Sequence, residues 1–270
     1  MSIKYVVKDH VARVTIDRPD RMNAIDEASE AELIRIWESI EKDTNVRCVV
    51  VTGAGERAFC TGADMKQSGN KTGLEYWGHT RVGGFGGLSL RDTLDVPVVA
   101  RVNGHALGGG MEMVLGCDIV VAAENATFGC PEPRVGRLAL EGGIAQLPRR
   151  IPHVWAMGML LTGRRISAAE ALRFGLVNEV VPQAGLDQAV DKWVADILAC
   201  APLSVKAVKQ MVRKGAQLSP QEAQMLKVPA LIAALNSTDQ DEACRPSSRS
   251  ARRSGRGGRC PTSSPRPASM

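Results

Sequence analysis

The sequence predicts an α/β fold that ends in a helical region. Short apolar runs typical of buried strands, such as RCVVVT at 47–52, recur through the first two thirds of the 270 residues. Segments with helical spacing lie between them, and after about Val181 only helical patterns follow. An apolar content of 44% supports a substantial core in a chain of this length.

The chain begins with two predicted strands and a helix. Residues 5–7 and 11–16 alternate apolar and polar side chains, as paired strands do. Residues 25–40 are predicted to be helical, with Asp26 as the N-cap. The apolar residues at helical spacing there are Leu33, Ile34, Trp37 and Ile40.

The middle of the chain alternates between strand and helix. Buried strands are predicted over 47–52, 98–102 and 118–123, and a short helix entered through glycine over 111–116. The C-terminal helices are predicted over 186–200, 204–217 and 220–235.

Two glutamates, Glu112 and Glu132, are the most informative residues. Glu112 follows three glycines at 108–110, and Glu132 follows Pro131. A helix N-terminus leaves backbone N–H groups unpaired, and glycine allows a ligand to approach them. A glutamate in that first turn could move protons on the bound group. The alternative is a tightly packed turn with two ordinary surface acids.

A second small-residue loop, GAGERAFCTGADM at 53–65, follows the strand at 47–52. Two such loops could together supply two backbone N–H donors to one carbonyl oxygen. A pair of this kind stabilises the enolate that forms next to a thioester.

At this point the chain resembles the enoyl-CoA hydratase/isomerase (crotonase) family. The resemblance spans roughly residues 3–242, in the family's order and spacing, and is closest in character to bacterial carnitinyl-CoA dehydratase-like hydratases. The segments that carry it are RPDRMNAI (18–25), AFCTGADM (58–65), NGHALGGGMEMVLGCDIVVA (103–122), FGCPEPRVG (128–136) and LTGRRISAAEALRFGLVNEVV (161–181).

The resemblance implies a fold and an assembly. The family fold is a spiral of β-β-α units followed by a helical region used in trimer formation, often as a dimer of trimers. We therefore expect a crotonase core over 1–182, a helical region over 183–242 and a homotrimer or homohexamer.

The resemblance also implies the chemistry, which is reversible hydration of a 2-enoyl-CoA to a 3-hydroxyacyl-CoA. The thioester oxygen would lie between the N–H groups of Ala63 and Gly109. Glu112 would activate the water and Glu132 would protonate C2. Two carboxyl groups that share a water should not both ionise easily. Family isomerases often keep only the glutamate that matches Glu132, so two glutamates favour a hydratase.

Six further residues match the family's CoA-binding loops. Those near the adenine and ribose are Arg21, Met22 and Ala24, and those beside the pantetheine are Thr61, Asp64 and Met65. Asp64 could instead cap a helix. CoA is part of the substrate, and no separate cofactor or metal is expected.

The main departure from the family lies at 139–143, where ALEGG replaces a segment like Pro-Gly-Ala-Gly-Gly. Glu141 therefore falls near the acyl pocket, at an expected helix start. It could favour the helix dipole. Alternatively, it is a third acid that selects a polar acyl group, as in a carnitinyl-CoA dehydratase, or changes the reaction, with isomerisation as another family outcome.

Other features have plainer interpretations. The Gly-rich residues 66–90 suit either a mobile segment over the acyl pocket or a variable surface loop. We expect His105 to be a core or supporting residue rather than a base. We expect Cys130 to be a packing residue rather than a nucleophile. The seven cysteines lack metal-ligand spacing and suit reduced thiols in a cytoplasmic protein.

The net charge of +5 comes from the tail at 243–270, which holds seven arginines. The remaining 27 basic and 29 acidic residues give −2, so the body shows no nucleic-acid footprint. No stretch approaches the length of a membrane span, and the first residues show no signal-peptide pattern.

The tail's composition predicts disorder. One extra G before a suitable codon set for 243–258 yields GLPAFVEKRPPVWTGR, a family-like ending, so we hypothesise a frameshift. The alternatives are a basic tail that binds RNA or acidic lipid, and an inactive family member.

Overall fold

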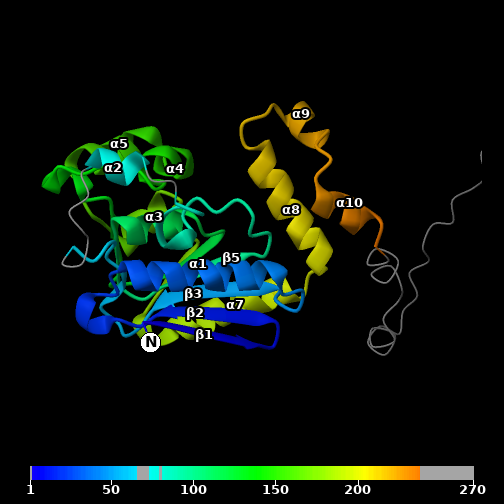
Figure 1. Cartoon of the computed structure of the whole chain (residues 1–270), viewed down its shortest axis with the longest axis horizontal. Coiled ribbons are helices and arrows are strands. Elements are labelled where there is room, and N and C mark those ends of the chain that lie inside the picture. The colour runs from blue at the N-terminus through cyan, green and yellow to red at the C-terminus, as the bar shows by residue number, and fades with distance from the viewer. Residues whose placement is uncertain (1, 66–72, 79–80, 238–270) are drawn as a thin grey trace, which may run out of the picture.

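The chain forms two sheets covered by helices, with a helical arm extending from one side (Figure 1). This computed structural model describes residues 2–65, 73–78 and 81–237. The tail at 243–270, with its frameshift hypothesis, lies outside the described residues.

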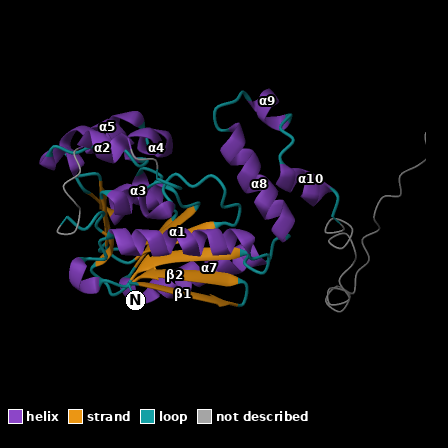
Figure 2. Cartoon of the chain, viewed as in Figure 1, coloured by secondary structure: helices purple, strands orange, loops and turns teal. Residues whose placement is uncertain are grey.

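The larger sheet has six strands in the order β1-β2-β3-β5-β7-β10 (Figure 2). Only β1 and β2 pair antiparallel, and the other neighbours pair parallel. Its strands are β1 (Ile3–Lys8), β2 (Val11–Ile16), β3 (Cys48–Gly53), β5 (Val98–Val102), β7 (Ile119–Ala123) and β10 (Glu179–Val181).

The smaller sheet has four strands in the order β4-β6-β8-β9, and only β9 runs antiparallel to its neighbour. Its strands are β4 (Ala58–Cys60), β6 (His105–Leu107), β8 (Thr127–Gly129) and β9 (Ile166–Ser167). Three times in succession, a strand of the large sheet is followed by one of the small sheet and then by helix. This repeat confirms the predicted spiral of β-β-α units.

Helices follow these strand pairs and form the C-terminal region. The longest are α1 (Glu27–Lys42), α5 (His153–Thr162), α7 (Leu186–Leu198) and α8 (Pro202–Gly215). The shorter ones are α2 (Gly73–Gly78), α3 (Gly109–Leu115), α4 (Gly143–Arg150), α6 (Ala168–Arg173), α9 (Pro220–Gln224) and α10 (Pro229–Leu235). Single 3-10 turns are η1 (Pro19–Arg21), η2 (Phe85–Gly87), η3 (Glu132–Val135) and η4 (Gln183–Gly185).

The predicted cap of α1 is confirmed, because the Asp26 side chain accepts a hydrogen bond from the Ser29 N–H at 2.8 Å. The single helix predicted over 220–235 is wrong. Val228 takes an extended conformation (φ −82°, ψ 149°), and α10 starts at Pro229. Proline lacks an N–H and disfavours helical geometry in the preceding residue, so one helical pattern becomes two short helices.

The expectation of a mobile or variable loop over 66–90 is wrong for its last part. Phe85 and Leu88 are buried, with Gly86 against Met113 and the Trp37 indole donating to the Gly86 carbonyl at 2.8 Å. Glycine is used here for close packing, which composition cannot distinguish from flexibility. Residues 66–72 and 79–80 lie outside the described residues.

The helical arm consists of α8, α9 and α10 and stands away from the sheets (Figure 1). Ion pairs join α8 to the body, with Lys209 Nζ 2.6 Å from Asp118 and Arg213 Nη2 2.7 Å from Asp95. None of the described helices is long and apolar enough to cross a bilayer.

Candidate active site

Glu112 lies in α3 and is only 3% exposed. Its Oε1 accepts a hydrogen bond from the Gly143 N–H at 3.0 Å. The short helix therefore carries a carboxyl group into the core, and the turn before α4 holds it there. This placement excludes the interpretation of Glu112 as a surface acid.

The three glycines before Glu112 are each required by a close contact. Gly108 has a φ of 58°, and a Cβ there would lie 3.1 Å from Glu132 Oε1. A Cβ on Gly109 would come within 2.6 Å of the Phe85 ring, and one on Gly110 would overlap the Cys60 carbonyl. The turn thus lets both a helix N-terminus and a second carboxylate approach the same place.

Glu132 opens the turn η3 directly after Pro131. Its Oε2 atom is buried and has no hydrogen-bond partner among the described residues. Its Oε1 atom faces Gly108, at the N-terminus of the helix that carries Glu112. The two glutamates approach the same turn, Glu112 from α3 and Glu132 from η3. Both glutamates therefore lie at the glycine turn.

Burial raises the pKa of both carboxyl groups, and like charge adds to the rise for Glu112. Burial, followed by the charges of Glu132 and Glu141, raises the pKa of Glu112 to about 7, against the opposing hydrogen bond from Gly143. Burial raises the pKa of Glu132 as well. A carboxyl group with a pKa of about 7, such as Glu112, can both hold and release a proton near neutral pH.

The N–H groups of Ala63 and Gly109 come from adjacent loops. Ile25 and Ala63 form a parallel β-bridge, in which the Ile25 N–H donates to the Gly62 carbonyl and the Asp64 N–H donates to the Ile25 carbonyl. In this geometry the Ala63 N–H points away from Ile25. Gly109 is the first residue of α3, where an N–H has no intrahelical partner. Gly62 has a φ of 93°, and a Cβ there would lie 3.1 Å from the Gly109 nitrogen.

The expected CoA-binding segments also adjoin one another. Thr61 Oγ1 donates to the Met22 carbonyl at 3.2 Å, which links the two loops. Arg21 is exposed at the end of η1, whereas Ala24 is buried. A cavity of about 70 Å³ lies between residues 19–23 and 54–58.

Asp64 is buried, whereas the neighbouring Met65 is exposed. The Asp64 carboxylate is 7% exposed and lies 3.0 Å from Arg18 Nη2, which also pairs with Asp26 at 2.9 Å. This ion pair joins two loops inside the protein. Met65 is 57% exposed, with Arg137 near its sulfur.

Glu141 precedes the N-cap Gly142 and is outside the first turn of α4, so the helix-dipole interpretation is wrong. Its carboxylate instead lies 3.8 Å from Arg81 Nε, and Arg81 also pairs with Glu30 at 3.0 Å. Sequence reasoning missed Arg81 and Glu30, and also the Gly143 N–H. No local pattern singles them out, because three separate segments bring them together.

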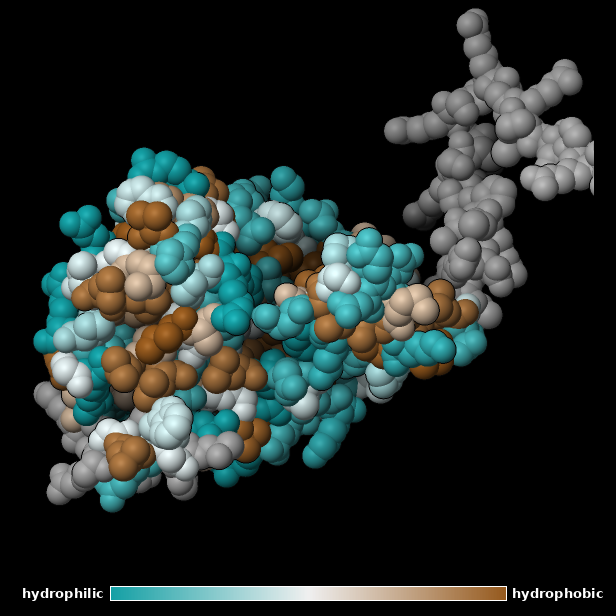
Figure 3. Space-filling model, turned by 90° about the horizontal axis from the view of Figure 1, so that it is seen from above, coloured by the Kyte–Doolittle hydropathy of each residue, from teal (hydrophilic) through white to brown (hydrophobic). Residues whose placement is uncertain are grey.

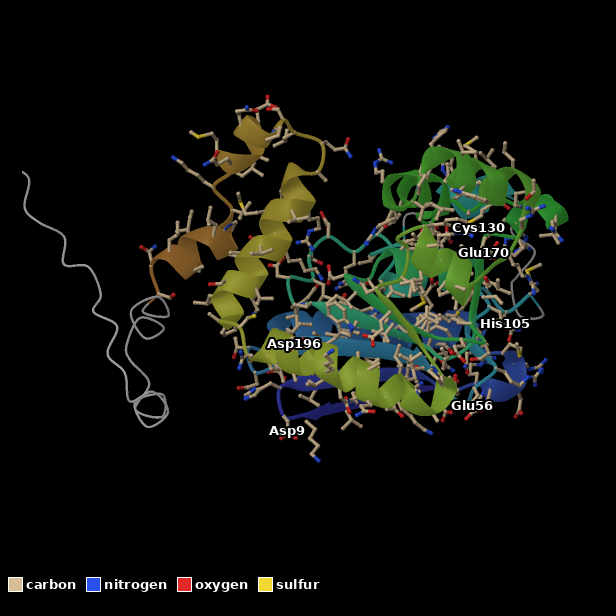
Figure 4. The ribbon with its side chains drawn as sticks, turned by 180° about the vertical axis from the view of Figure 1, so that it is seen from behind. Asp9, Glu56, His105, Cys130, Glu170 and Asp196 are labelled. Carbon is tan, nitrogen blue, oxygen red and sulfur yellow. The ribbon has the colours of Figure 1, made fainter. Side chains whose placement is uncertain are left out.

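The surroundings of His105 and Cys130, both labelled in Figure 4, fit structural roles. His105 Nδ1 lies 2.7 Å from Thr127 Oγ1 on the neighbouring strand. Burial, together with the charges of Glu132 and Glu112, raises the pKa of the Cys130 thiol, which disfavours a nucleophilic thiolate. Within the described ranges, no cluster of histidine, cysteine or acidic side chains is arranged to hold a metal ion.

The structure combines a spiral α/β fold with two carboxyl groups of raised pKa at one glycine turn. The family profile described as enoyl-CoA hydratase/isomerase matches residues 7–245. The chain belongs to this family, the crotonase family, whose members named below are enoyl-CoA hydratases and dehydratases. The match ends three residues into the arginine-rich tail at 243–270.

Named relatives support the same assignment. The chain is 43% identical over 218 residues to the (E)-benzylidenesuccinyl-CoA hydratase of Thauera aromatica, covering 78% of this chain and 81% of the relative. It is 37% identical over 215 residues to the carnitinyl-CoA dehydratase of Escherichia coli K12, covering 79% and 80%.

Solved structures agree with the fold. The enoyl-CoA hydratase of Bacillus anthracis superimposes with a TM-score of 0.81 at 31% identity, covering 90% of this chain and 94% of that one. A carnitinyl-CoA dehydratase of Mycobacterium avium gives a TM-score of 0.72 at 34% identity, covering 91% and 96%.

Proposed function

We propose that this enzyme reversibly hydrates a 2-enoyl-CoA to a 3-hydroxyacyl-CoA. The observation that carries the proposal is the pair formed by the buried Glu112 and the half-buried Glu132, which approach one glycine turn from two elements. Both have raised pKa values, so one proton can be shared between them.

In the proposed mechanism, the N–H groups of Ala63 and Gly109 bind the thioester oxygen and draw electron density from the C2–C3 double bond. Glu112 takes a proton from water as the water oxygen bonds to C3, and the π electrons move into an enolate. Glu132 then delivers its proton to C2, and the carbonyl is restored. Each N–H donor is worth about 10²–10³ in rate.

The proton count stays constant during this cycle. Before hydration Glu132 holds the proton, and afterwards Glu112 holds it. The active enzyme is therefore the singly protonated pair in both directions. A pKa of about 7 for Glu112 suits this exchange near neutral pH.

A polar acyl group is the second candidate substrate class. It is favoured by Glu141 with its partner Arg81, and by likeness to relatives named for benzylidenesuccinyl-CoA and carnitinyl-CoA. Dehydration of a polar 3-hydroxyacyl-CoA would use the same two glutamates in reverse.

We also propose assembly as a trimer or hexamer through the arm. Its helices expose apolar side chains, seen as brown surface on the arm in Figure 3. They include Val208, Val212, Met225 and Leu235. Light scattering on the full chain tests this, and a monomer at micromolar concentration would refute it.

The experiment that tests the activity is hydration of crotonyl-CoA, followed as loss of the conjugated thioester absorbance. We expect turnover in the wild-type chain and a loss of roughly 10²–10⁴ in both Glu112→Gln and Glu132→Gln. Near-normal turnover in Glu112→Gln would refute the assignment of two catalytic glutamates. If wild type is inactive, carnitinyl-CoA and the chain with a repaired C-terminal reading frame are assayed next.

A further inference from the structure

The turn that leads into α4 both holds Glu112 and carries a carboxylate of its own. The Gly143 N–H donates to Glu112 Oε1 at 3.0 Å, and the backbone of Glu141 also donates toward that carboxyl group. Ser89 anchors this turn, because its Oγ donates a hydrogen bond to the Glu141 carbonyl at 2.6 Å. The position of the Glu141 side chain relative to Glu112 is therefore set by a short, anchored stretch of backbone.

The Glu141 carboxylate is 13% exposed and faces Arg81, whose Nε lies 3.8 Å away. Arg81 Nη1 lies 3.0 Å from Glu30 Oε1 on α1. The pKa of Glu141 lies above its ordinary value because of burial, with Arg81 opposing the rise and Glu30 adding to it. Arg81 is thus the group that favours an ionised Glu141 in a buried setting.

The groups that act on Glu112 come from two elements besides its own helix. Glu132 approaches from η3 and Glu141 from the turn before α4, and both raise its pKa. Cys130 is also close, because a Cβ on Gly143 would touch both its sulfur (3.2 Å) and Glu112 Oε1 (3.3 Å). Its own raised pKa keeps that thiol neutral.

We propose that Glu141 is a positioning residue for the acid–base pair. Its carboxylate, which Arg81 keeps ionised, places a negative charge near Glu112. Because of this charge, Glu112 and Glu132 keep their shared proton up to a higher pH. The charge acts through Glu112 and needs no contact with the substrate. This role rests on the proposed function, in which the singly protonated pair is the active form.

The sign of the effect follows from that active form. The reaction fails on the alkaline side when the pair loses its last proton. A nearby negative charge opposes that loss, so removal of the Glu141 charge must move the alkaline limb to lower pH. A Glu141 that only stabilised its turn would lower activity equally at every pH.

The kinetic test compares the pH profiles of kcat/KM for crotonyl-CoA in wild type, Glu141→Gln and Glu141→Asp. We expect the alkaline limb of Glu141→Gln to move to lower pH by about 0.5–1 unit. In Glu141→Asp, which keeps the charge, the limb should lie close to that of wild type. The matched control is Glu41→Gln, which also removes an arginine-paired carboxylate, since Glu41 Oε1 lies 2.6 Å from Arg91 Nε. Its pH profile should equal that of wild type.

A second measurement needs no turnover. Infrared difference spectra across pH follow the protonated carboxyl band of Glu112, assigned by its loss in Glu112→Gln. The band should titrate at lower pH in Glu141→Gln than in wild type. An unchanged band overturns the proposal, whatever the kinetics show. A shifted band in a chain without hydratase activity would support this role for Glu141 while refuting the proposed function.

Discussion

Glu112 and Glu132 face the same glycine turn but are held in different ways. Glu112 is part of a buried helix, is 3% exposed and accepts an N–H from Gly143. Glu132 starts a 3-10 turn after Pro131, and its buried Oε2 has no partner among the described residues. The first carboxyl group is fixed by the protein, whereas the second retains hydrogen-bonding capacity for a reacting molecule.

This difference suggests why hydration would use two carboxyl groups instead of one. In the proposed mechanism, the fixed group orients a small water molecule, and the less constrained group follows the C2 carbon between two geometries.

The sharpest comparison separates water activation from proton transfer at C2. Glu112→Gln should lose roughly 10²–10⁴ in hydration but retain slow solvent-deuterium exchange at C2 of a 3-hydroxyacyl-CoA. Glu132→Gln should lose both, because it lacks the group that serves C2. Mass spectrometry of substrate recovered from D2O measures the exchange. Exchange that persists in Glu132→Gln but not in Glu112→Gln would reverse the two roles.

The glycine turn offers the next comparison. Gly108→Ala places a Cβ at a φ of 58° and 3.1 Å from Glu132 Oε1, so it should displace that carboxylate and lower kcat by about 10²-fold. Gly136→Ala, at the end of η3, has a φ of 68° but nothing within 4 Å of the new Cβ. It carries the backbone strain alone and should change kcat less than about threefold. Equal losses in the two variants would mean that strain, and not contact with Glu132, limits the turn.

The third prediction concerns stability against pH. The pKa of Glu112 is about 7 in the folded protein and 4.5 as its ordinary value, so the folded state binds more protons between these values. Wild type should therefore lose stability as pH rises from about 4.5 to 7, by up to about 3 kcal/mol from this group. Glu112→Gln, which stays neutral, should lack that contribution.

Urea unfolding of both proteins at pH 5 and pH 8, at one protein concentration, measures the difference. Relative to wild type, the free energy of unfolding of Glu112→Gln should be higher at pH 8 than at pH 5. A constant difference between the two proteins at both pH values would show that Glu112 has an ordinary pKa in the folded state.

The smallest expected effect on catalysis concerns Asp64. Its carboxylate is buried against Arg18, so Asp64→Asn should lower stability by about 1–3 kcal/mol and leave KM for crotonyl-CoA within about twofold. Thermal unfolding and steady-state kinetics measure the two quantities. A tenfold higher KM with unchanged stability would support the CoA-binding role predicted for Asp64 from the sequence.

Local patterns were sufficient for much of the fold. Alternation and apolar runs predicted most strands of the larger sheet, and Asp26 predicted the start of α1 within a residue. The error at 220–235 arose because the helical spacing of apolar residues continues through Pro229, although a proline there cannot continue the helix. The three-residue strand β4 and the two-residue strand β9 went unpredicted, since such short segments carry no clear periodicity.

The sequence by itself determined the residue types of the site, since three adjacent glycines and two following glutamates are local facts. Only the tertiary structure decided which carboxyl groups lie close together, because proximity between α3, η3 and the turn before α4 depends on packing across the sheets. It also decided that Asp64 faces Arg18 and that Glu141 faces Arg81. A side chain's charge is written in the sequence, but its pKa depends on neighbours that folding brings from distant segments.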